Sequence, residues 1–397
     1  MGGNVKKVFL LVLFLSGMNL FTKNVNISEN MNKELFECLS SNLEMTEIEF
    51  SLDGYRVEKI FEDGTNYEKI SYFDSGEFLE IGKPDLPRFS RLVAVPDQGE
   101  VSVNVLSFEE EIISNIDVYP RQRLISESQP NERSFVIDEE FYKNGEIFPG
   151  KIVEIGEPAI MRDFRIVNLT INPFQYDPIK KELKIIKNIE LEITSSRTGG
   201  ENPKTINHKK SRFFEPIYES TIVNYSSIIT RDEEYQQPSY LFIYPENASV
   251  LQTLNYMREW KHQKGFEVVA ASTSETGTQL NQIKNYIQDA YDNWQNPPEF
   301  VCLVGDAGGN FSIPTGHIDP GQYNGEGDQY YTLLEGDDIL ADVLIGRLSF
   351  NSIFEFQTIV SKILNYEKTP YMDNTEWYDK ALMLGDPTDS GPSCVDT

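Results

Sequence analysis

Carboxylates crowd residues 335–342, a stretch that we call the acidic loop and that leads into an apolar run ending at Gly346-Arg347. Asp306 follows a glycine at the end of another apolar run. Calcium takes roughly six to eight oxygens from carboxylates and backbone carbonyls. A loop with Asp338 and Asp342, joined by Asp306 from a neighbouring strand end, is therefore a candidate calcium site. The helix-loop-helix calcium motif is missing, and a solvated acidic loop is the alternative interpretation.

No cysteine or histidine has the surroundings of a nucleophile or its base. Cys302 lies within an apolar run, which predicts an inert core residue, and Cys394 is close to the last residue. Cys38 lies in a poorly patterned stretch, His262 is expected near a helix end, and His317 is expected in a loop. No serine stands in a G-x-S-x-G motif. We therefore assign no catalytic residue within this sequence.

The elements that position these residues alternate between strands and helices after Tyr240. Short apolar runs predict strands, and apolar residues at helical spacing predict helices of roughly 15 residues between them. The expected strands are 240–244, 268–271, 300–304, 343–345 and 381–384, and the expected helices are 251–260, 280–294 and 353–368. This order predicts an α/β domain with a mostly parallel sheet and helices on both faces. Sites in such sheets form at the carboxyl ends of the strands, where Asp306, Arg347 and Asp386 are expected.

The preceding part, from about residue 48 to 194, has a period of two. Val101, Val103 and Val105 alternate with polar residues, and turn-forming Gly, Pro and Asn residues separate the runs. This pattern predicts an antiparallel sandwich or barrel. Residues 197–238 are richer in polar and turn-forming residues and predict a linker.

The amino-acid composition argues against one class of partner, and the N-terminal residues indicate the location of the protein. The 397 residues carry 35 Lys and Arg against 63 Asp and Glu, for a net charge of −28, which argues against nucleic acid as a partner. The first 24 residues hold adjacent lysines and the apolar run 8–15, which is typical of a secretory signal peptide. No clear cleavage triplet follows, so a retained N-terminal anchor is the alternative. We expect export, with no other membrane association, and a secreted or cell-surface location.

Several motifs, taken in order, resemble the gingipain family of secreted bacterial cysteine peptidases. They are Tyr240-Leu-Phe-Ile-Tyr-Pro, Leu303-Val-Gly-Asp306, Asp328-Gln-Tyr-Tyr331 and Ile345-Gly-Arg-Leu-Ser349. Upstream, Gly82-Lys-Pro-Asp-Leu-Pro87 and Asn172-Pro-Phe-Gln-Tyr-Asp-Pro178 are similar to the propeptide of that family. The resemblance implies a signal peptide (1–24), a β-rich propeptide (25–196), a linker or activation segment (197–238) and the N-terminal part of a caspase-like α/β domain (239–397).

The resemblance also implies a mechanism that this sequence does not complete. Members of the family cleave proteins and peptides with a Cys-His dyad, and their own propeptide assists folding and inhibits them. The family's Gly-His-Gly strand end and later cysteine do not occur here. Gly316-His317-Ile318 echoes the first motif, but it stands too early. We therefore expect the sequence to be truncated at its C-terminus, with the dyad encoded downstream.

Two sets of site residues follow from the resemblance. The calcium site of the family maps to the carboxylates of Asp306, Asp338 and Asp342 and to the carbonyls of Glu335 and Leu340. Activation by cleavage after a basic residue maps to the bond between Arg231 and Asp232. Two other functions stay open: a non-catalytic member of the family that serves in binding or surface protein export, and an unrelated extracellular calcium-dependent adhesin.

Overall fold

The computed structural model describes residues 22–27, 34–123, 134–229, 234–318 and 325–382. Residues 1–21 of the predicted signal peptide lie outside them, whereas residues 22–24 begin strand β1.

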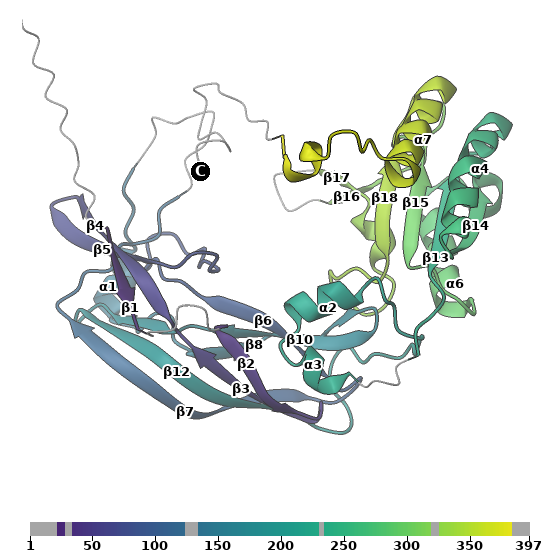
Figure 1. Ribbon diagram of the computed structural model, residues 1–397. Helices are drawn as coiled ribbons and strands as arrows, with labels where there is room; N and C mark the ends of the chain where they lie inside the picture. The colour runs from purple at the N-terminus through teal and green to yellow at the C-terminus, as the bar shows by residue number, and fades with distance from the viewer. Residues whose placement is uncertain (1–21, 28–33, 124–133, 230–233, 319–324, 383–397) are drawn as a thin grey trace, which may run out of the picture.

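The first half of the chain forms three antiparallel sheets, as predicted (Figure 1). The first contains β1 (Thr22–Asn26), β4 (Gly54–Glu62) and β5 (Thr65–Ser71). The second contains β6 (Phe89–Val95), β8 (Val153–Ile155), β9 (Ala159–Met161) and β10 (Phe164–Ile171). The third contains β2 (Phe36–Ser41), β3 (Met45–Ser51), β7 (Val101–Ser114), β11 (Phe174–Asp177) and β12 (Glu182–Ser195).

The second and third sheets share one hydrophobic core. Alternate residues of β3, among them Ile48 and Phe50, are buried and belong to the same cluster as Val93 of β6 and Val167 of β10. The rings of Phe50 and Phe89 lie 5.4 Å apart. Because strand residues alternate between two faces, the period of two in the sequence places one apolar face of each sheet in this sandwich.

The segment that we predicted as a linker contains packed helices. Helix α2 (Glu215–Thr221) and helix α3 (Tyr225–Ile228) follow the last strand of the sandwich, and a short helix α1 (Glu139–Asn144) lies earlier in the chain. Phe214, Tyr218 and Tyr225 are buried against Phe164 and Ile166 of β10. Aromatic side chains thus anchor this polar segment to the sandwich.

The second half is an α/β domain, which confirms the prediction. Its parallel sheet has the order β14-β13-β15-β18, with a small β16-β17 ribbon beside it. The strands are β13 (Ser239–Tyr244), β14 (Glu267–Ser272), β15 (Phe300–Val304), β16 (Gly316–Ile318), β17 (Gly325–Gly327) and β18 (Leu344–Leu348). The helices are α4 (Ala248–Gln263), α5 (Thr273–Thr276), α6 (Leu280–Asn293) and α7 (Ile353–Lys368), with 3-10 helices η1 (Gln329–Thr332) and η2 (Glu376–Asp379).

Helices cover both faces of the parallel sheet. Helices α4 and α7 pack on one face through Leu254 and Phe356, and α6 packs on the other through Ile283 and Ile287. Continuous burial along β13 and β15 explains their uninterrupted apolar sequences. Of the predicted fifth strand, residues 381–382 lie outside any strand, and residues 383–384 are outside the described ranges.

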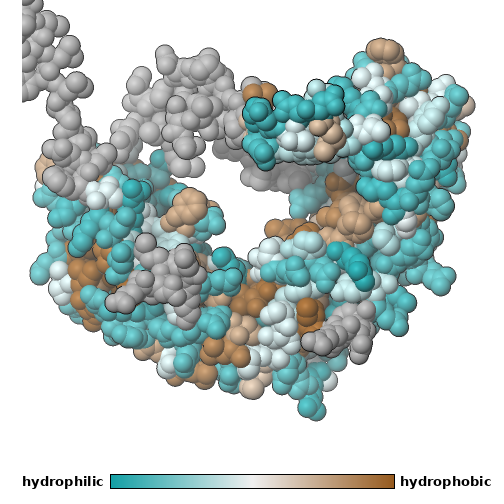
Figure 2. Space-filling view, in the orientation of Figure 1, coloured by the Kyte–Doolittle hydropathy of each residue, from teal (hydrophilic) through white to brown (hydrophobic). Residues whose placement is uncertain are grey.

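The two halves meet at one end of the parallel sheet. Figure 1 shows the starts of the central strands close to β10 and α2, and Figure 2 shows an open space between the halves beyond this junction. Because the strands start at the junction, their carboxyl ends point away from it.

Within the described ranges, no helix has the length and apolar character needed to cross a bilayer.

Candidate functional site

The carboxyl edge of the sheet is organised by Arg347 at the end of β18. Its guanidinium donates to both carboxylate oxygens of Asp328, at 2.9 Å from Nε and 2.7 Å from Nη2. Nη1 also donates to the carbonyls of Gly305 and Ile313, at 3.1 and 2.7 Å. A planar guanidinium suits this bidentate geometry, so one side chain fixes the loop that follows β15.

Asp306 lies in that loop but does not join the acidic loop in a cluster. One of its carboxylate oxygens accepts a hydrogen bond from the N–H of Ala307 at 2.9 Å. Gly305 before it has φ of +146°, and a Cβ there would stand 2.1 Å from the carbonyl oxygen of Phe311. The turn therefore requires glycine, as expected for a strand end of this type.

The acidic loop lies at the junction between the halves, and its carboxylates accept hydrogen bonds from N–H groups of the first half. Asp338 accepts from the N–H of Ile160 at 2.7 Å and from the amide of Asn202 at 3.0 Å. Glu335 accepts from the N–H groups of Thr205 and Ile206 at 2.8 and 2.9 Å.

Asp342 is completely buried in the same loop. It accepts from the N–H of Arg162 at 3.0 Å and from the N–H groups of Leu334 and Glu335, both at 2.8 Å. The N–H of Leu340 donates to Asp338 at 2.8 Å, which turns the loop back on itself. Burial raises the pKa of Asp342 to about 6, and the three N–H donors oppose this rise.

This donor set does not fit a metal ion in the arrangement described. A cation needs the lone pairs that N–H groups occupy here, and N–H dipoles point their positive ends at the same oxygens. Within the described ranges, no three His, Cys, Asp or Glu side chains are placed to hold a metal. Calcium at Asp306, Glu335, Asp338, Leu340 and Asp342 stays a prediction.

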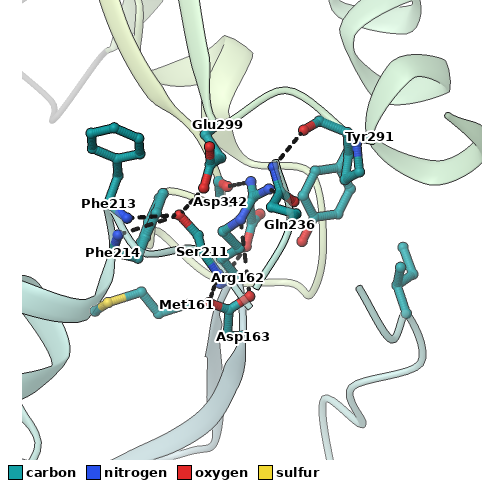
Figure 3. A network of polar contacts seen from close by, with 12 residues as sticks. Met161, Arg162, Asp163, Ser211, Phe213, Phe214, Gln236, Tyr291, Glu299 and Asp342 are labelled. Atoms are coloured by element: carbon teal, nitrogen blue, oxygen red, sulfur yellow. Dashed lines mark hydrogen bonds and ion pairs between the residues drawn. The ribbon is translucent and has the colours of Figure 1, made fainter. Parts of the chain in front are cut away.

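Arg162, which the sequence analysis missed, is the centre of the junction (Figure 3). It occupies the turn between β9 and β10, and its side chain is fully buried in the second half. Nη1 donates to the carbonyls of Pro298 and Asp342 at 3.0 and 2.7 Å, and Nη2 donates to Oε1 of Gln236 at 3.0 Å. The guanidinium also lies 5.6 Å from the ring centre of Tyr291. A buried arginine is tolerated because carbonyl and amide oxygens replace its hydration.

Other buried acids complete this network. Asp163 accepts from the N–H of Ser211 at 3.0 Å, and Glu299 accepts from the hydroxyl of Ser211 at 2.5 Å and from the N–H of Ser239 at 3.1 Å. Burial raises the pKa values of Asp163 and Glu299. Clusters of shifted pKa values occur at active sites and in structural networks alike. Glu299 and Asp342 of the second half accept from Ser211 and Arg162 of the first half, which makes the network an interdomain anchor.

The thiols of the described ranges have no catalytic partner. Cys302 is buried, as predicted, and burial raises its pKa to about 12. Sγ of Cys38 lies 3.6 Å from the hydroxyl of Ser227, and burial raises its pKa as well. His262 lies in the last turn of α4, as predicted, and His317 lies in strand β16 where a loop was expected. Cys394 is outside the described ranges.

The predicted cleavage site, Arg231 and Asp232, also lies outside the described ranges. Helix α3 ends at Ile228 before it. After it, Glu234 pairs with Lys209 at 2.9 Å, and both side chains are mostly exposed.

Two family models together cover residues 27–396 and meet after residue 232. Residues 27–232 match the family model Propeptide_C25, and residues 233–396 match the model for Peptidase family C25. Gingipain R1 of Porphyromonas gingivalis is 27% identical over 384 residues, which cover 96% of this chain and 37% of that protein. Lys-gingipain of the same organism is 26% identical over 399 residues, which cover 96% of this chain and 22% of that protein. The chain thus spans less than half the length of these curated relatives.

Two solved structures match part of this chain. A chain from the complex of Porphyromonas gingivalis RgpB pro- and mature domains is 24% identical, with a TM-score of 0.44 over 49% of this chain and 98% of that chain. A structure on the zymogenic latency of gingipain K is 25% identical, with a TM-score of 0.38 over 44% of this chain and 99% of that chain.

Proposed function

Because this chain belongs to peptidase family C25, we propose that it is the propeptide and the first part of the catalytic domain of an exported, gingipain-type cysteine endopeptidase precursor. The order of the two matched regions carries this proposal. A propeptide region runs to residue 232, and a peptidase region begins at residue 233.

Latency through the first half is part of the proposal. The buried contacts of Arg162, together with the hydrogen bonds to Glu335 and Asp338, support a propeptide that stays bound to the domain that it precedes. Cleavage after Arg231 would separate the chain next to the boundary of the two matched regions. The buried junction would then hold the propeptide in place without a covalent link, as an inhibitor of its own peptidase.

Proton transfer between a cysteine and a histidine requires both groups within hydrogen-bond reach. Cys302 cannot serve, because its thiol is buried and its pKa is about 12. We propose that the dyad comes from sequence beyond Thr397, where the family's Gly-His-Gly strand end and later cysteine would follow. Protein and peptide substrates then follow from the peptidase chemistry.

The test is to express the longest reading frame that contains this chain and to assay hydrolysis of casein and of arginyl and lysyl peptides. We expect activity that a thiol-directed inhibitor abolishes, and a processed product whose N-terminus is Asp232. The matched control is Arg231→Gln, which should remove that N-terminus. An extended protein that folds and is exported, yet has no activity and no Gly-His-Gly motif or later cysteine, would instead support a non-catalytic binding or export role.

Calcium is tested separately, since its predicted ligands accept N–H donors in the precursor. Calorimetry with calcium, run beside magnesium on the precursor and on the processed protein, measures whether a site exists in either form. Saturable calcium binding by the processed protein alone would indicate that release of the propeptide frees the carboxylates. Binding that needs no peptidase region would favour the adhesin.

A further inference from the structure

Strand β7 is a long outer edge of the third sheet of the first half. Its 14 residues pair with β12, from Val101 opposite Ser195 to Ser114 opposite Glu182, and with no other described strand. Figure 1 shows β7 at the margin of the sandwich, on the side away from the parallel sheet. Residues 104–112 are all exposed. One edge of the backbone of β7 is therefore open to another strand.

Part of this edge lacks the usual protection against pairing. Natural edge strands are kept from pairing by charges, by prolines or by a short length. Residues 101–108 of β7, which we call the open edge, contain neither a charged residue nor a proline. Within them, Val105, Leu106 and Phe108 are 42%, 54% and 46% exposed. An exposed, apolar and strand-forming sequence of this kind is typical of an edge to which a further strand is added.

On the core side, the open edge leaves the margin of the sandwich uncovered. Val105 lies opposite Leu191 and Phe108 opposite Ile189 in the pairing with β12. Leu191 and Ile189 are fully buried. Because directly opposed residues share one face of a sheet, Val105 and Phe108 continue the core face out to its margin. An added strand with apolar residues on this side would cover them.

The outer face beside the open edge is acidic. Glutamates of neighbouring strands lie directly opposite one another on it: Glu37 with Glu49, Glu49 with Glu190, and Glu47 with Glu192. The row reaches β7 at Ser107, whose hydroxyl donates to Glu190 at 3.1 Å. Like charges directly opposite each other on adjacent strands destabilise a sheet. Cations placed beside β7 would relieve this repulsion.

The other end of β7 shows how the same strands neutralise charge. There Glu110 pairs with Lys184 at 3.2 Å, and Glu111 pairs with Lys187 at 2.7 Å. Beside the open edge, the neighbouring segments of β2, β3 and β12 contain no lysine or arginine (36–41, 45–51 and 188–195). Cations for this end would therefore come from outside the sheet.

A second copy of this chain fits the open edge poorly. Its own β7 would bring Glu109, Glu110 and Glu111 but no lysine or arginine, and each chain has a net charge of −28. The pairing with β12 skips Leu106, and such a bulge bends a strand and hinders flat pairing of identical edges. The charges and the bulge thus favour a different, basic polypeptide.

We propose that the open edge is a docking site for an extended segment of another, basic polypeptide, which adds as a strand beside β7. Apolar residues of that segment alternate with lysine or arginine, so that the apolar side chains cover the core side and the cations face Glu190 and Glu192. The backbone of the added strand lies about 10 Å from β12, two strand spacings away, which the side chains from both strands span together. This interaction goes beyond the proposed function and does not depend on it.

The test is the binding of a short labelled peptide of alternating valine and lysine to the full chain, read by fluorescence anisotropy. One control peptide has the same residues in two blocks, and another has glutamate in place of lysine. We expect the alternating peptide alone to bind, with an affinity that falls as salt is raised. Equal binding of the block peptide would show attraction without strand addition, and equal binding of the glutamate peptide would show that charge does not select the partner. Either result would overturn the proposal.

Variants of β7 and β12 locate the site. Val105→Lys places a cation on the open edge and should weaken binding of the alternating peptide about tenfold or more. Ile112→Lys is the matched control, because Ile112 is 51% exposed on the same strand but lies outside the open edge, and it should change the affinity less than about twofold. Glu190→Gln combined with Glu192→Gln should weaken binding and reduce its dependence on salt. Equal effects of the two lysine variants would refute the assignment of the open edge.

Amide hydrogen exchange on the unmodified chain decides the case if Val105→Lys does not fold. Strand addition requires that the alternating peptide slow exchange within residues 101–108 but not in β2, which is another edge of the same sheet. Slower exchange in β2 instead would overturn the proposal. So would a chain that binds no peptide because it self-associates through β7.

Discussion

Removing the carboxylate of Asp338 should open the contact between the β9–β10 hairpin and the acidic loop. The carboxylate accepts from the N–H of Ile160 at 2.7 Å and from the amide of Asn202 at 3.0 Å, and both donors belong to the first half. A hydrogen bond to a charged group contributes about 1.5–3 kcal/mol when it is shielded from water. Asp338 is only half-buried, so we expect Asp338→Ala to lower the free energy of local opening by about 2 kcal/mol in total.

Amide hydrogen exchange at Ile160 measures this opening directly, because its N–H is the donor in the lost hydrogen bond. A loss of about 2 kcal/mol corresponds to exchange about 30-fold faster when reclosing outpaces exchange. Amides of the sandwich core, such as that of Leu191 in β12, should keep their protection. The whole protein would then remain folded while the junction opens.

Asp337→Ala is the matched control for this experiment. Asp337 is exposed, and its contact with Asn202 uses the backbone N–H, which the substitution retains. Unchanged exchange at Ile160 in Asp338→Ala, or the same acceleration in both variants, would refute the assignment of Asp338 as an interdomain acceptor.

Three further predictions concern single side chains of the second half. Although burial raises the pKa of Glu367, hydrogen bonds from Lys261, Trp260 and Lys264 lower it to about 2. The ordinary pKa of this carboxyl is 4.5, so its stabilising effect is complete above that pH and is lost as the pH falls through about 2. Glu367→Gln should lower the free energy of unfolding by about 2 kcal/mol at pH 7, after a discount for partial exposure. The melting temperature of the variant should also fall less steeply than that of the wild type as the pH is lowered from 4.5 to about 2. Melting temperatures that fall equally steeply with pH in the wild type and the variant would contradict this. Cys302 should resist iodoacetamide in the native chain and react fully in denaturant, as read by mass spectrometry; rapid native labelling would disprove its burial. Arg347→Lys should lose the bidentate pair with Asp328 and accelerate amide exchange in residues 305–315 by about tenfold or more, whereas unchanged protection would show that the loop is held by other contacts.

The longer helices and the four parallel strands of the second half could be predicted because each carries its own local pattern. The apolar run 300–304 corresponds to β15 and the helical spacing of 353–368 to α7. The short helices α2 and α3 were missed, since a helix of four to seven residues has too few turns to show a period. Their stability comes from Tyr218 and Tyr225 packing on β10, a contact made far along the chain.

The role of the acidic loop could not be predicted from its composition. Carboxylates accept hydrogen bonds and bind cations with the same lone pairs, so the sequence alone does not separate the two outcomes. The deciding partners, Ile160 and Arg162, lie 178 and 180 residues away from Asp338 and Asp342. Arg162 itself stands in a polar two-residue turn, and nothing in such a turn distinguishes a solvated arginine from a buried one.

The hydrogen bonds that Arg162 donates across the junction have an evolutionary consequence. A first half taken from a relative that lacks arginine at this turn would leave Gln236 and the carbonyls of Pro298 and Asp342 without their donor. Recombination that exchanges only one side of the molecule would then leave buried oxygens without hydrogen bonds. Inheritance should therefore keep the two portions together as one unit, and chimeras should succeed only where both sides of this contact are transferred at once.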